Sequence, residues 1–101
     1  MSDFFILDEN HNVIPAANTL EWGEFFNKPD RIVAATEIGE IRVSTVFLGI
    51  DHSWGGDKPV VFETMIFGGE HDQYQDRCCT WVEAEAMHVK AVAIAKGELA
   101  P

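Results

Sequence analysis

Two histidines and two glutamates are the side chains best suited to chemistry in this sequence of 101 residues. Glu85 and His88 lie three positions apart in a segment rich in Ala and Val, so a helix would place both on one face. A sheet could bring His52 and Glu63 close to them. Such a group can bind Zn²⁺ or another divalent cation, or it can transfer protons as acid and base. One hypothesis is therefore that the protein is a small hydrolase. The alternative is a solvated Glu85 and a hydrogen-bonded His88, because no H-E-x-x-H, G-x-S-x-G or phosphate-loop motif is present.

The segment 51–59 (DHSWGGDKP) is a second candidate site, because it separates two apolar, β-branched runs. Short hairpin loops are normally small polar turns, whereas this one carries a tryptophan. A large aromatic side chain on a polar loop can anchor a protein partner. The alternative is that this indole packs onto the sheet edge and that the first aspartate caps the turn. The predicted partner-binding residues are Asp51, His52, Trp54, Gly55, Gly56 and Asp57.

Cys78 and Cys79 are adjacent, and neighbouring cysteines rarely form a disulfide with each other. The sequence has no C-x-x-C motif. Two cysteines without a disulfide or a metal-binding motif are typical of a protein in a reducing compartment. Both precede an expected helix, and the positive end of a helix dipole lowers the pKa of a thiol. A nucleophilic cysteine is therefore the weaker hypothesis, and buried small side chains are the favoured interpretation.

The charge is strongly acidic, with 17 acidic and 7 basic residues and a formal net charge of −10. Such a chain repels phosphates and anionic membranes, so we expect no direct nucleic acid binding and no membrane association. It suits a partner protein with a basic surface, although solubility alone is the alternative explanation. The N-terminus lacks the features of a signal peptide, which predicts a cytoplasmic protein, and we expect no cofactor.

The apolar pattern predicts a single α+β domain over residues 1–101, with 98–101 frayed. We expect an antiparallel β-sheet of about four to five strands, with a short helix and one longer C-terminal helix packed on it. The strands at 41–50 and 60–67 form its central hairpin, and 70–77 is predicted to be a loop. Glu63 shares a strand face with apolar residues, so its half-buried carboxylate needs a hydrogen-bond donor.

The C-terminal helix has clear end signals. Thr80 and Glu83 form a capping box, and Gly97 suits the position after the last turn. The side chains expected to face the sheet are Val82, Ala86, Val89 and Ala93, with Trp81, Met87 and Ile94 at the edges.

Several strings give the chain a resemblance to known proteins: ILDENHNVI, LEWGEFF, VSTVFLGIDH, VVFETMIFGG and TWVEAEAMH. With these, the chain resembles a family of small, mostly uncharacterised proteins encoded by tailed bacteriophages and prophages, over about residues 5–90. The resemblance implies an accessory protein in the host bacterial cytoplasm, of the kind that binds and disables host machinery such as CRISPR or nucleotide-signalling defences. It implies no catalytic residue.

The leading hypothesis is therefore a non-enzymatic, acidic phage protein that inhibits a host factor, for example as an anti-CRISPR protein. One alternative is the hydrolase described above. The other is a sponge for a small signalling nucleotide, with Trp54 stacking on a base and the amides of Gly55 and Gly56 meeting phosphate. The sequence leaves the oligomeric state open, with a homodimer as one alternative.

Overall fold

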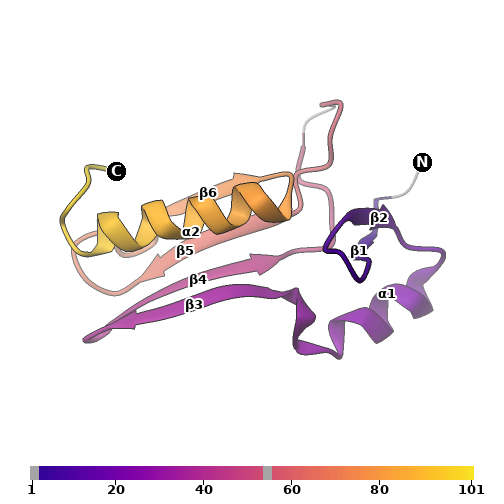
Figure 1. Cartoon of the computed structure of the whole chain (residues 1–101), viewed down its shortest axis with the longest axis horizontal. Helices are drawn as coiled ribbons and strands as arrows, with labels where there is room; N and C mark the ends of the chain where they lie inside the picture. The colour runs from indigo at the N-terminus through magenta and orange to yellow at the C-terminus, as the bar shows by residue number, and fades with distance from the viewer. Residues whose placement is uncertain (1–2, 54–55) are drawn as a thin grey trace.

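The computed structural model describes residues 3–53 and 56–101. In that part of the chain, β3 to β6 form one antiparallel sheet in the order β3-β4-β5-β6, and β1 and β2 form a separate hairpin. α2 packs across all four strands of the larger sheet, while α1 and the hairpin lie at the end where β4 terminates (Figure 1). The predicted α+β class is confirmed. The elements are β1 (Phe5–Leu7), β2 (Val13–Pro15), α1 (Thr19–Phe26), η1 (Pro29–Arg31), β3 (Ile32–Ile38), β4 (Ile41–Phe47), β5 (Phe62–Phe67), β6 (Gln75–Cys78) and α2 (Trp81–Ala95).

Strand β4 ends at Phe47, earlier than the predicted residue 50, because Gly49 turns the chain out of the sheet with φ +74°. The Gly49 carbonyl accepts hydrogen bonds from the Phe5 amide at 2.8 Å and from the Trp22 indole at 3.1 Å. A Cβ at this position would overlap the ring of Phe26. Only glycine allows both this backbone conformation and this close approach, so Gly49 docks α1 and the hairpin onto the sheet.

The prediction of a loop over residues 70–77 is wrong for its second half, because β6 (Gln75–Cys78) pairs with β5 along the edge of the sheet. Its four residues are mostly polar because an edge strand exposes much of its surface to water. In the central hairpin, Thr45 of β4 lies opposite Thr64 of β5.

Helix α2 has the predicted capping box, but it turns a different face to the sheet. Its buried residues are Ala84, Met87, His88, Ala91 and Ile94. The prediction that Val82 and Val89 face the sheet is wrong, since these side chains are 74% and 70% exposed. The helix is apolar on nearly every side, so periodicity alone allowed two solutions. The longer Met and Ile side chains fill the space above the sheet, and the Val and Ala row is left outside.

Among the described residues, the buried apolar side chains form two core clusters. The larger one joins Phe47 and Phe62 of the sheet to Phe25 of α1, Leu7 of the hairpin and Met87 of α2. The smaller one holds Val43, Ile66, Ala91 and Ile94 towards the far end of the helix. The aromatic cluster thus fixes the end of the sheet from which the chain leaves β4 and later enters β5.

Candidate functional site

The loop between β4 and β5 is held at its neck by Asp51. Its carboxylate accepts the backbone amides of Ser53 at 2.8 Å and Val60 at 2.9 Å, and the Ser53 hydroxyl at 2.9 Å. The His52 amide donates to the Val60 carbonyl at 2.9 Å, which ties the two sides of the neck together. The amide of Ser53, followed by that of Val60, lowers the pKa of Asp51 because these donors stabilise the carboxylate. Asp51 therefore caps the turn, as the alternative interpretation of the sequence had it.

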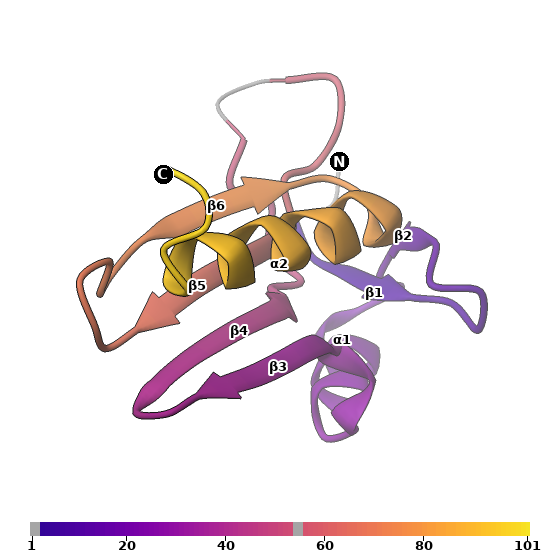
Figure 2. The same ribbon diagram turned by 60° about the vertical axis from the view of Figure 1, so that its left-hand side comes forward.

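Beyond this neck, the described residues 56–58 of the loop stand away from the sheet (Figures 1 and 2). Its described side chains at His52, Asp57 and Lys58 are exposed, as is Gly56. Trp54 and Gly55 lie outside the described residues, so their predicted contact roles stay predictions. The described part of the loop is an exposed segment on a hydrogen-bonded base.

The side chain of His88 is buried between α2 and the sheet, and both of its ring nitrogens form hydrogen bonds. Its Nδ1 lies 2.7 Å from the Thr45 hydroxyl, and its Nε2 lies 2.8 Å from the Thr36 hydroxyl. The Thr45 hydroxyl also bonds to that of Thr64, so three threonines and the imidazole form one hydrogen-bonded chain, in which Thr36 is half-buried and the other groups are buried. Burial lowers the pKa of His88, which favours the neutral ring. The residue is a structural link between the helix and three strands.

Glu63 lies on the opposite face of the sheet from His88, because it precedes Thr64 on β5 and neighbouring strand residues point to opposite faces. Its carboxylate accepts from the Arg77 guanidinium at 3.0 Å and from the Gln75 side-chain amide. The side chain of Glu63 is 16% exposed, so the expected half-buried carboxylate has the donors that it needs.

The four residues of the hydrolase hypothesis are therefore not brought together. Glu85 is exposed on α2 and His52 belongs to the loop, while the sheet separates Glu63 from His88. Within residues 3–53 and 56–101, no group of three or more His, Cys, Asp or Glu side chains could hold a metal ion.

The two cysteines have raised pKa values rather than the lowered values that the helix dipole suggested. Burial raises the pKa of Cys78 to about 11, and burial also raises the pKa of Cys79. Glu83 adds to both shifts, because a nearby carboxylate disfavours a thiolate. Both thiols are free, and their chemistry is that of partly buried side chains rather than of nucleophiles.

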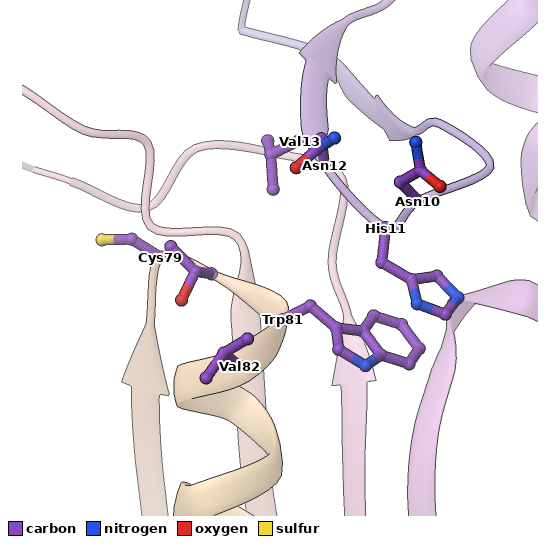
Figure 3. Close-up of a pocket in the computed structure, with 8 residues that line it drawn as sticks. Asn10, His11, Asn12, Val13, Cys79, Trp81 and Val82 are labelled. Carbon is purple, nitrogen blue, oxygen red and sulfur yellow. The ribbon is translucent and has the colours of Figure 1, made fainter.

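A cleft of about 300 Å³ lies between the hairpin loop and the start of α2 (Figure 3). The ring of His11 stacks on Trp81 in this cleft, with centroids 3.7 Å apart and planes inclined by 9°. The sequence offered no signal for this contact, because a polar turn and a helix start far along the chain carry no shared pattern. The lining residues are Asn10, His11, Asn12, Val13, Cys79, Thr80, Trp81 and Val82. They include neither Lys nor Arg.

Neither a family model, nor a curated protein, nor a solved structure matches this chain. None of the helices in the described part of the chain combines the length and the apolar content that crossing a membrane requires.

Proposed function

We propose that this protein is a non-enzymatic binding protein that inhibits a host factor, as an acidic accessory protein of phage origin acting on an antiphage defence system. The observation that carries the proposal is the neck at Asp51, which holds an exposed loop away from the sheet. A loop with a hydrogen-bonded base loses less conformational freedom when it binds, so more of its contact energy appears as affinity.

The partner that fits is a protein with a basic surface. The chain carries a net charge of −10, and Asp57 is exposed on the loop itself. A field of this sign accelerates the encounter with a basic groove and opposes an encounter with nucleic acid.

The two rival functions have less support. The hydrolase would need His52, Glu63, Glu85 and His88 within reach of one substrate, and the sheet keeps Glu63 apart from His88. The nucleotide sponge would depend on Trp54 and on the amides of Gly55 and Gly56, and Trp54 and Gly55 lie outside the described residues. It would also have to bring phosphate groups to a chain with a net charge of −10.

The test uses two charge reversals of equal size at opposite ends of β4. Asp57→Lys alters the loop, and Glu40→Lys alters an exposed position in the turn before Ile41. Immobilised wild-type chain is used to capture proteins from a host lysate, and the affinity for each captured protein is then measured at several salt concentrations. We expect the affinity to fall about tenfold or more between 50 and 300 mM salt. Asp57→Lys should weaken it several-fold more than Glu40→Lys does.

Equal effects of the two reversals would show that the loop is not the contact. An affinity that does not change with ionic strength would contradict the electrostatic part of the proposal.

The aromatic anchor is tested separately by Trp54→Ala. If the indole is a binding hot spot, its removal should cost about 2 kcal/mol or more of binding free energy, which is roughly a 30-fold loss of affinity. Thermal unfolding of the variant should match that of the wild type. An unchanged affinity would remove Trp54 from the interface.

A further inference from the structure

The outer side of α2 carries an apolar row that the described elements leave uncovered. Val82 and Val89 are 74% and 70% exposed. Ala86 is exposed between them, and Ala93 is half-buried at the end of the row. In Figures 1 and 2, the sheet lies against one side of α2, and no other helix or strand of the described residues lies against the opposite side. Val82, at the N-terminal end of the row, borders the cleft beside the hairpin loop. Single exposed apolar side chains are ordinary, but three exposed side chains and a half-buried one in line on one helix form a continuous strip.

The row has the spacing of a coiled-coil seam, since its members follow one another at intervals of four, three and four residues. It is also symmetric about its midpoint. An antiparallel copy of the same helix would place Val82 against Ala93 and Ala86 against Val89. Each larger side chain then meets a small one, so two helices can approach closely without overlap. A parallel copy would place Val against Val and Ala against Ala, which alternates tight contacts with gaps.

The charges beside the row fit the same arrangement. Glu83 and Lys90 are seven residues apart and therefore lie on one flank of the row. An antiparallel twofold arrangement brings Glu83 of each copy beside Lys90 of the other. Along the row and on this flank the helix is thus complementary to itself in size and charge. Glu85 lies on the other flank, and the whole chain is strongly acidic.

We infer that α2 pairs with α2 of a second copy of this chain, antiparallel about a twofold axis, through Val82, Ala86, Val89 and Ala93. The contact uses one helix of 15 residues from each copy, which is less surface than the roughly 1,200–2,000 Å² of stable interfaces. The dimer is therefore weak, with a dissociation constant on the order of 100 µM. The inference does not depend on the proposed function, because it uses α2 and not the loop.

Analytical ultracentrifugation of the full chain tests the pairing over a concentration range from 10 µM to 1 mM. Salt near 0.15 M screens the repulsion between the two acidic copies beyond about 8 Å. The wild-type mass should rise towards that of two chains. Val89→Glu should raise the dissociation constant about 100-fold or more, because each copy would bury a charge without a partner. Lys90→Glu should raise it about fivefold, since it sets like charges side by side.

Leu20→Glu is the matched control, because Leu20 is also 70% exposed on a helix and the change has the same chemistry. It should self-associate like the wild type. Thermal unfolding confirms that each variant is folded. A wild-type mass that stays at one chain up to 1 mM, or Val89→Glu that associates as well as the wild type, would overturn the inference.

The orientation is tested with a spin label on Lys96→Cys in a Cys78→Ser, Cys79→Ser background. Antiparallel helices keep the two labels roughly 25 Å or more apart, given a rise of about 1.5 Å per residue. Labels within about 15 Å of each other would indicate parallel helices and contradict the twofold antiparallel arrangement.

Discussion

At the scale of single residues, His88 shows how a side chain suited to catalysis can serve structure instead. The imidazole is 6% exposed, and both ring nitrogens lie within hydrogen-bond distance of threonine hydroxyls. Burial alone lowers its pKa, so the folded state holds the neutral ring and resists its protonation. This arrangement ties protein stability to pH.

We predict that the free energy of unfolding decreases as the pH falls below 6.5. The unfolded chain takes up a proton on His88 near its ordinary pKa of 6.5, whereas the buried ring has a lower pKa. The contribution of the neutral His88 ring to the free energy of unfolding is present in full above pH 6.5. It is lost as the pH falls towards the pKa of His88 in the folded state, with a slope of at most about 1.4 kcal/mol per pH unit. Urea unfolding between pH 5 and pH 8 measures it.

His88→Gln keeps a hydrogen-bonding side chain that cannot take up the proton, so it should remove this slope. His52→Gln changes a histidine that is exposed in the loop and should retain the slope. A slope that persists in His88→Gln would assign the pH dependence to another group.

At the scale of elements, Gly49 is the point where α1 and the hairpin join the sheet. The glycine carbonyl accepts hydrogen bonds from both, and the rings of Phe26 and Trp22 occupy the space that a Cβ at this position would need. The orientation of the N-terminal elements therefore depends on the absence of a side chain at one position of the chain.

Gly49→Ala should destabilise the protein by about 2–4 kcal/mol for two reasons. The added methyl group would overlap the rings of Phe26 and Trp22, and alanine disfavours the left-handed backbone conformation of this position. Gly23→Ala is the control: Gly23 lies inside α1 with nothing within 4 Å of an added Cβ, so this change should stabilise by about 0.5–1 kcal/mol. Chemical denaturation of the two variants measures both effects. Equal changes in the two variants would show that Gly49 is not a docking point.

At the scale of the whole molecule, a net charge of −10 on one small domain opposes compaction. Only two salt bridges occur among the described residues, Arg42 with Glu37 and Arg77 with Glu63. Most carboxylates are therefore balanced by solvent ions rather than by neighbouring bases.

Raising the salt concentration from 20 to 300 mM should increase the free energy of unfolding by about 1 kcal/mol, because salt screens this self-repulsion. Thermal or urea unfolding at each concentration measures the effect. A variant with Glu24→Lys and Glu98→Lys, both at exposed positions, carries less negative charge and should respond less. A wild type whose stability falls with salt would show that local ion pairs outweigh the net charge.

Much of the fold could be predicted because its signals act over a few residues. Asn18 caps α1, Thr80 and Glu83 cap α2, and β-branched runs mark the central strands. The polar edge strand Gln75–Cys78 could not be predicted, because its pairing partner rather than its own side chains makes it a strand.

Some features of the candidate site could likewise be predicted from the sequence, and others could not. The sequence alone determined the acidic balance, the unusual loop between β4 and β5 and the need of Glu63 for a donor. Only the tertiary structure decided that Glu63 and His88 lie on opposite faces of the sheet, that His11 meets Trp81 and which face of α2 is outside. The reason is physical: caps and turns depend on neighbours in sequence, whereas the buried face of a helix that is apolar on most sides depends on how side chains from distant segments fill one space.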